Sequence, residues 1–157
     1  MASAITGIIA VLGTLLGVTV TYVFQARTAK QAHQTAREER LWQERLTTYS
    51  TFAGALTDFR NSQNDRWQHE RQDPRSQALT AAQDESRRNR AEATSALFRL
   101  RLLANGTLSE LASAALKLTE EIPQAADEYD RRDRERKARH ALANFTEAAA
   151  AQITGDR

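Results

Sequence analysis

The sequence predicts an all-α protein in which one N-terminal transmembrane helix continues into a cytoplasmic antiparallel bundle, or coiled coil, of three to four helices. Three observations carry this prediction. Residues 4–24 are apolar and uncharged. Beyond them, apolar residues recur at helical intervals. The 157 residues include Gly 6 and Pro 2, too few turn residues for an all-β or α/β fold.

Residues 1–26 are expected to form a membrane anchor whose span is residues 4–24. A helix of that length is about 31 Å long, close to the hydrocarbon thickness of about 30 Å. A cleaved signal peptide is the competing interpretation, but a basic n-region and an A-x-A-like cleavage site are absent or poor. The first basic residues, Arg27 and Lys30, follow the span. The positive-inside rule therefore predicts a single-pass inner (plasma) membrane protein with its N-terminus outside and its C-terminus in the cytoplasm.

Small residues line one stripe of this span. Gly13 and Gly17 form a G-x-x-x-G motif, and Ala10 and Thr21 continue its face. Small residues at this spacing let two helix backbones approach closely in lipid. The stripe predicts either a homo-oligomer or contact with the span of another membrane protein.

Residues 27–157 are expected to form the cytoplasmic bundle. We expect its helices at about residues 27–72, 76–104, 107–122 and 124–153. Asp73-Pro74 marks the first turn, because the residue before a proline avoids helical geometry. Asn105-Gly106 marks the second, as a usual C-terminal stop signal. The apolar positions that predict the core are Trp42, Leu46, Tyr49, Phe52, Ala53, Leu56, Phe59, Trp67, Leu79, Ala82, Ala93, Leu97, Leu100, Leu103, Leu111, Ala115, Leu118, Ile122, Tyr129, Leu142, Phe145 and Ile153.

Local signals refine these helices. Thr107 and Glu110 match a capping box at the start of the third helix. Pro123 either kinks that helix or starts the fourth, and the last helix either packs on the bundle or projects from it. Gly54 costs about 1 kcal/mol in a helix interior but would permit a close helix crossing.

Residues 127–140 form the densest charge run. Each acid there has a base four residues further on, an arrangement that stabilises an exposed helix. The predicted pairs are Asp127–Arg131, Glu128–Arg132, Asp130–Arg134, Asp133–Lys137 and Glu135–Arg139. We therefore expect a solvated helix rather than a strip that binds nucleic acid, since such a strip needs uncompensated bases.

The sequence predicts no enzyme, no cofactor and no metal site. It has Cys 0, which excludes thiolate ligands and a cysteine nucleophile. His33, His69 and His140 lack the spacing that would place two metal ligands on one helix face. No glycine-rich phosphate loop and no nucleophile elbow occurs.

Basic residues suggest two contacts with anionic groups. Arg27 and Lys30 are close enough to the span to hold lipid headgroups. Arg87, Arg88 and Arg90 form the densest basic cluster and are the candidates for phosphate binding. Neighbouring acids partly neutralise this cluster, and the net charge is only +2, so nucleic acid is disfavoured as a partner.

The segment Asp65-Arg66-Trp67 places a large aromatic residue among polar ones. Two interpretations stay open for Trp67. It either seals the tip of the first hairpin against Leu79, as large aromatic residues usually pack, or it is exposed and anchors a partner together with Asp65 and Arg66.

Several motifs resemble those of small single-pass proteins of actinobacteria that are called KilB-like. The residues that carry the resemblance are Leu12-Gly13-Thr14-Leu15-Leu16-Gly17, Thr21-Tyr22-Val23-Phe24-Gln25, Gln43-Glu44-Arg45-Leu46, Tyr49, Phe52-Ala53-Gly54-Ala55-Leu56-Thr57, Asp65-Arg66-Trp67 and Asp73-Pro74. The resemblance covers roughly residues 10–105 and is weaker towards the C-terminus. It implies a link to the spread of conjugative plasmids between mycelial compartments, and it brings no catalytic motif with it.

Together these observations predict a non-enzymatic single-pass membrane protein with a cytoplasmic helical scaffold, acting as an accessory in plasmid spread or conjugative transfer. Its expected partners are membrane lipid and either a second copy or another membrane protein. Two alternatives stay open: a membrane-tethered nucleic-acid-binding protein, and a membrane-active, toxin-like protein.

Overall fold

The computed structural model of the chain describes residues 2–155 and the side chains of residues 36–155. The chain divides into two compact units, residues 1–42 and residues 43–157. The first helix, α1 (Ala2–Gln72), belongs to both units. Among the side chains described, no helix is long and apolar enough to cross a membrane. The predicted span, residues 4–24, lies outside the residues whose side chains are described.

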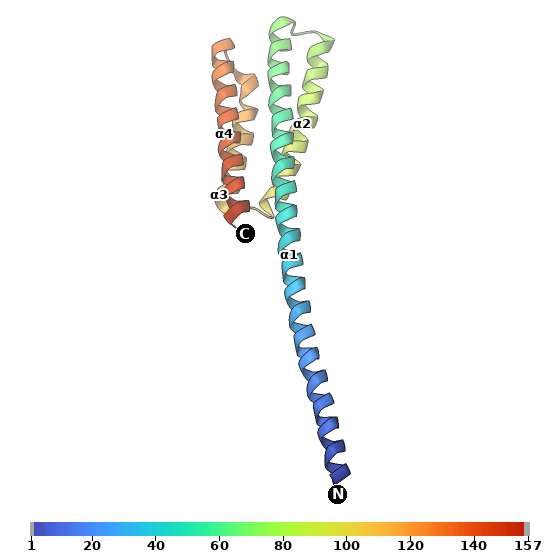
Figure 1. Cartoon of the computed structure of the whole chain (residues 1–157). Coiled ribbons are helices and arrows are strands. Elements are labelled where there is room, and N and C mark those ends of the chain that lie inside the picture. Colours follow the sequence, from blue (N-terminus) through green and yellow to red (C-terminus); the bar gives the residue numbers. More distant parts are fainter. Residues whose placement is uncertain (1, 156–157) are drawn as a thin grey trace. The chain divides into compact units, whose positions relative to one another are not determined.

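The second unit is a bundle of antiparallel helices. The C-terminal part of α1 is followed by α2 (Gln77–Arg101), α3 (Gly106–Glu120), the short 3-10 helix η1 (Ile122–Gln124) and α4 (Glu128–Gly155). Figure 1 shows these α-helices side by side, each reversing the direction of the one before it. The all-helical prediction is confirmed for the part of the chain that the structure describes, which contains no strand.

The turn between α1 and α2 follows from Asp73-Pro74. The helix ends at Gln72, and the backbone N–H of Arg75 donates to the Asp73 carboxylate at 3.0 Å. Ser76 then caps α2, since its hydroxyl oxygen accepts a hydrogen bond from the Leu79 N–H at 3.1 Å. A proline-containing turn and a serine cap thus direct the chain back along α1.

The next turn differs from the sequence prediction. Helix α2 ends at Arg101, earlier than expected, and Asn105 starts the next helix instead of ending the previous one. Its side-chain oxygen accepts from the Leu108 N–H at 2.8 Å. The predicted capping box of Thr107 and Glu110 is therefore wrong. An asparagine two residues earlier caps at least as well as threonine, and it takes the N-cap position.

Pro123 neither kinks α3 nor starts α4 directly. It lies in η1, near the start of a 3-10 turn, where its missing N–H costs nothing. Helix α4 begins later, and Asp127 accepts from the Asp130 N–H at 2.8 Å. The Asp130 carboxylate in turn accepts from the Ala126 N–H at 2.9 Å. These reciprocal bonds fix the start of the charged helix.

All four helices contribute to the core. Phe52 and Phe145 are fully buried, and their rings meet edge-on with centroids 5.0 Å apart. Tyr49 also meets Phe145 edge-on at 6.4 Å, and its hydroxyl donates to the Leu103 carbonyl at 3.3 Å. The continuous buried cluster is Tyr49, Phe52, Leu56, Phe59, Ala93, Ala96, Leu97, Leu100, Leu108, Ala112, Ala115, Leu116, Phe145 and Ala149. Helix α4, whose packing the sequence left open, therefore packs on the bundle.

Two positions of the predicted core, and one predicted helix crossing, differ in the structure. Leu46 is 40% exposed and Tyr129 is 82% exposed. Tyr129 lies away from the buried side of α4, since it is about half a turn from the buried Ala138 at 100° per residue. Gly54 makes no close crossing, because a Cβ built there meets nothing within 4 Å.

Candidate functional site

The predicted basic cluster lies on the exposed side of α2. The guanidinium of Arg87 pairs with Asp84 at 2.6 Å on the same helix. Arg90 pairs with Glu120 of α3 at 2.8 Å. Arg88 has no carboxylate partner among the residues that the structure describes. Two of the three arginines are thus already engaged by acids, which lowers the positive potential available for phosphate.

An open cleft adjoins this cluster. Its lining residues are Arg87, Arg90, Ala91, Thr94, Ser95 and Phe98. Phe98 is 59% exposed and Leu102, at the end of the helix, is 84% exposed. The sequence does not mark either residue as exposed. Leu97, Phe98, Leu100 and Leu102 are all apolar, so composition alone did not show which of them face solvent.

Trp67 is buried near the hairpin tip, with only 8% of its surface exposed. Its indole N–H donates to the carbonyl of Ala125, in the segment between η1 and α4, at 3.1 Å. Trp67 is therefore packed rather than an exposed anchor, but its contacts are with the Ala125 backbone and with arginines, and the predicted contact with Leu79 stays a prediction. Its neighbours Asp65 and Arg66 are exposed and partly exposed, respectively.

Two guanidinium groups lie over the Trp67 ring. The Cζ atom of Arg71 is 4.9 Å from the ring centre, and that of Arg131 is 5.5 Å from it. Arg71 also donates to the carbonyls of Ala125 and Ala126. The indole and the two arginines thereby join α1 to the start of α4.

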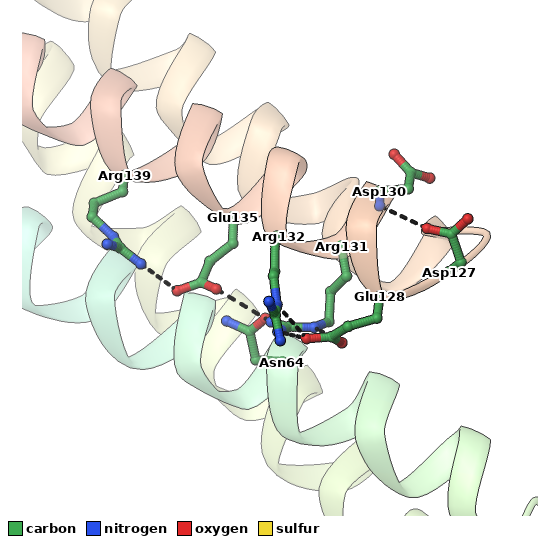
Figure 2. A network of polar contacts seen from close by, with 8 residues as sticks. All are labelled: Asn64, Asp127, Glu128, Asp130, Arg131, Arg132, Glu135 and Arg139. Atoms are coloured by element: carbon green, nitrogen blue, oxygen red, sulfur yellow. Dashed lines mark hydrogen bonds and ion pairs between the residues drawn. The ribbon is translucent and has the colours of Figure 1, made fainter.

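Arg131 is the centre of a polar network that Figure 2 shows in close-up. Its guanidinium binds both carboxylate oxygens of Glu128, at 2.9 and 2.8 Å. It also donates to the side-chain oxygen of Asn64 on α1 at 2.6 Å and to Glu135 at 3.2 Å. A buried arginine needs partners of this kind, because an unpaired buried charge is costly.

The predicted i,i+4 ion pairs of residues 127–140 form, with one exception. The observed pairs are Glu128–Arg132 at 2.7 Å, Asp130–Arg134 at 2.9 Å, Asp133–Lys137 at 2.7 Å and Glu135–Arg139 at 2.6 Å. The exception is Asp127, which caps α4, while Arg131 pairs with Glu128 and Glu135 instead. The pattern within one helix could not reveal that Arg131 faces α1.

This network shifts the acidity of its members. Hydrogen bonds from Arg131, and then from Arg132, lower the pKa of Glu128 from its ordinary 4.5 to about 2. A hydrogen bond from Arg134 lowers the pKa of Asp130, and one from Lys137 lowers that of Asp133. The acids at the start of α4 are therefore held in their charged form.

A second, smaller cleft lies between α1 and α2 near their turn. Asp65, His69 and Glu85 contribute polar groups to its lining, over a floor of alanines. Within the described part of the chain, no group of three or more His, Asp or Glu side chains is placed to hold a metal ion.

The remaining predicted site residues are those expected to lie in the membrane or next to it. Gly13, Gly17, Ala10 and Thr21, which form the small-residue stripe, lie outside the residues whose side chains are described. The same holds for Arg27 and Lys30, the predicted lipid contacts. These assignments stay predictions from the sequence.

Comparison with known proteins gives one match. The family model described as KilB plasmid transfer protein matches residues 46–153. The match covers most of α4, so the expectation that the resemblance weakens towards the C-terminus after residue 105 is wrong, whereas residues 10–45 of the expected range lie outside the match. No curated protein and no solved structure matches the chain. Because the family model covers about two thirds of the 157 residues, the chain belongs to the KilB plasmid transfer protein family.

Proposed function

We propose that this protein is a non-enzymatic accessory of plasmid transfer, held at the inner membrane by its N-terminal helix, in the manner of small single-pass proteins of actinobacteria. The observation that carries the proposal is the family match over residues 46–153, which takes in the core of the helical bundle.

The uncharged stretch at residues 4–24 supports the membrane location. The basic residues that follow it, beginning with Arg27 and Lys30, favour a cytoplasmic bundle, and they are available to anionic headgroups. In this arrangement the anchor supplies location and the bundle supplies contacts.

The stripe of Gly13 and Gly17 supports assembly, either with a second copy or with the span of another membrane protein. Self-association through the anchor would bring several bundles together at one place on the membrane. An accessory protein without its own chemistry would act through such a cluster.

The nucleic-acid alternative receives less support from the charges. Arg87 and Arg90 are paired with acids, and the basic residues of α4 are largely paired as well. A protein that binds phosphates gains affinity by releasing counterions from them, which already neutralised bases do poorly.

The frequency of plasmid transfer tests the proposal. We expect donors that lack the chain to transfer or spread the plasmid less efficiently, and we expect the full chain supplied in trans to restore the frequency. A plasmid that transfers and spreads equally well without the chain would refute an accessory role. Binding of DNA by the full chain with strong salt dependence would favour the nucleic-acid alternative instead.

A further inference from the structure

The outer side of α2 carries an apolar strip. Ala91 is exposed, and Phe98 and Leu102 are 59% and 84% exposed. Their spacing places them on one side of the helix, opposite the buried Ala93, Leu97 and Leu100. Single exposed apolar residues are ordinary, but two large ones on the same helix side, beside an open cleft, form a surface that a partner can cover.

Arginines flank this strip on both sides. Arg88 and Arg99 lie along one edge, and Arg90 and Arg101 lie along the other, each pair separated by roughly three helical turns. Arg90 is paired with Glu120. Arg101 donates to the Ser113 hydroxyl at 3.0 Å and lies 5.8 Å from the Phe98 ring centre.

The charges of these edges are not balanced. Within the part of the chain that the structure describes, no carboxylate lies within 4.0 Å of the guanidinium of Arg88, Arg99 or Arg101. The contrast with α4 is clear, because there the bases are satisfied by acids of the same helix. The edges of the α2 strip therefore have unsatisfied positive charge available to a partner.

An apolar strip between two rows of guanidinium groups is complementary to a helix with an apolar strip between two rows of carboxylates. The apolar centre would supply most of the affinity, and the charged edges would supply orientation and association rate. Nucleic acid fits less well, because the centre of the strip consists of Phe98 and Leu102 and contains no base-stacking platform of several aromatics.

We propose that this strip of α2, comprising Ala91, Phe98 and Leu102 with the flanking Arg88, Arg90, Arg99 and Arg101, docks an acidic amphipathic helix of a partner protein. The inference rests on the proposed function in that a protein without its own chemistry acts through its partners. Docking on α2 does not depend on the membrane anchor. The docking proposal and the proposed function can therefore fail separately.

A fluorescently labelled peptide tests the proposal against the full chain in nanodiscs of zwitterionic lipid. The probe is a helix of about five turns with leucines at i, i+3, i+4 and i+7 and glutamates on both flanks. We expect it to bind, with an affinity that falls as salt is added. A peptide with the same leucines and lysine flanks should not bind.

Variants of the strip separate the contribution of its apolar centre from that of its charged edges. Replacing both Phe98→Ala and Leu102→Ala should lower the affinity about tenfold or more, because both side chains are exposed and available for contact. Replacing both Arg88→Ala and Arg99→Ala should weaken binding and flatten its salt dependence. Tyr129→Ala on α4 and Arg75→Ala at the first turn remove a comparably exposed aromatic and an exposed arginine elsewhere, and should leave binding unchanged.

Several results would overturn the proposal: no binding of the acidic peptide, equal binding of the lysine peptide, or no effect of either double variant. If Phe98→Ala with Leu102→Ala instead breaks a homo-oligomer or abolishes binding to anionic vesicles, the strip serves a second copy or lipid. Loss of transfer on removing the chain, combined with no peptide binding, would leave the proposed function intact and refute this docking surface alone.

Discussion

At the scale of single residues, one glycine in α1 bears on the stability of the bundle. Gly54 belongs to one of the motifs that resemble the KilB-like proteins, and a glycine in a helix interior suggests a close crossing. In the structure, however, nothing lies within 4 Å of a Cβ built on it. The residue therefore weakens its helix without the packing gain that would compensate.

Replacing Gly54→Ala should stabilise the bundle by about 0.5–1 kcal/mol, because alanine has the higher helix propensity and the space is open. Denaturant unfolding followed by circular dichroism measures the change. Gly106→Ala, at the first position of α3, also meets open space but should gain less at a helix end. A loss of stability in Gly54→Ala would show that a second helix closely approaches this position.

A buried polar pair joins α1 to α2. The Ser86 hydroxyl donates to the side-chain oxygen of Gln63 at 2.7 Å, and both residues are buried, with relative exposures of 4% each. Neither residue was a core candidate from the sequence, because serine and glutamine are usually exposed. Their bond satisfies two polar groups that burial would otherwise leave unpaired.

Ser86→Ala should therefore destabilise the bundle by about 1–3 kcal/mol, since it leaves the Gln63 amide without its partner. The same unfolding experiment measures the loss. Ser95→Ala, an exposed serine on the same helix, serves as the control and should change stability by less than about 0.5 kcal/mol. An equal effect of the two substitutions would mean that the buried bond contributes nothing.

At the scale of elements, interactions between charged groups stabilise the first turn of α4. The lowered pKa of Glu128, caused first by its hydrogen bond to Arg131, means that the folded chain prefers the carboxylate. The stabilisation is present above the ordinary pKa of 4.5 and is lost as the pH falls towards about 2. Solvent screens part of it, because the Glu128 side chain is 48% exposed.

Thermal unfolding at a series of pH values between neutrality and about pH 2 checks this expectation. The melting temperature should fall over the acid range, and Glu128→Gln should fall less steeply because it has no proton to bind. Glu110→Gln, an exposed glutamate on α3, should follow the unmodified chain. Parallel curves for all three proteins would exclude Glu128 as a source of acid sensitivity.

The small-residue stripe predicts that assembly occurs through residues 4–24. Gly13→Leu or Gly17→Leu should reduce crosslinking between spans in native membranes, since a bulky side chain prevents close backbone approach. Leu12→Ala, which lies off the stripe, is the matched control. A chain that is strictly monomeric, or crosslinks unchanged by either glycine substitution, would contradict assembly through this helix.

At the scale of the whole molecule, sequence periodicity predicted the all-helical bundle, because apolar spacing and the Asp73-Pro74 turn are local signals. It did not predict that Arg131 lies inside, because ion-pair spacing within one helix carries no information about Asn64 and Trp67 on another. The exposure of Phe98 and Leu102 was not predicted for the same reason. The local sequence shows that a residue is apolar, but it does not show whether another helix covers that residue.

We propose that the predicted membrane anchor and the bundle serve one function, so a change confined to the anchor should abolish that function. Leu15→Arg with Leu16→Arg places two charges in the predicted span, each costing about 2.5–3.5 kcal/mol at the centre of a membrane helix. Gln43→Arg with Thr47→Arg adds the same charges at exposed positions of α1 and is the matched control.

Plasmid transfer frequency from donors that carry these full-length variants is the most direct measurement. We predict that the unmodified chain and the control pair restore transfer to a donor lacking the chain, whereas the Leu15→Arg, Leu16→Arg variant leaves it at the level of that donor. Full transfer with the charged span would contradict a membrane-anchored mode of action, and undiminished transfer without the chain would contradict its role altogether.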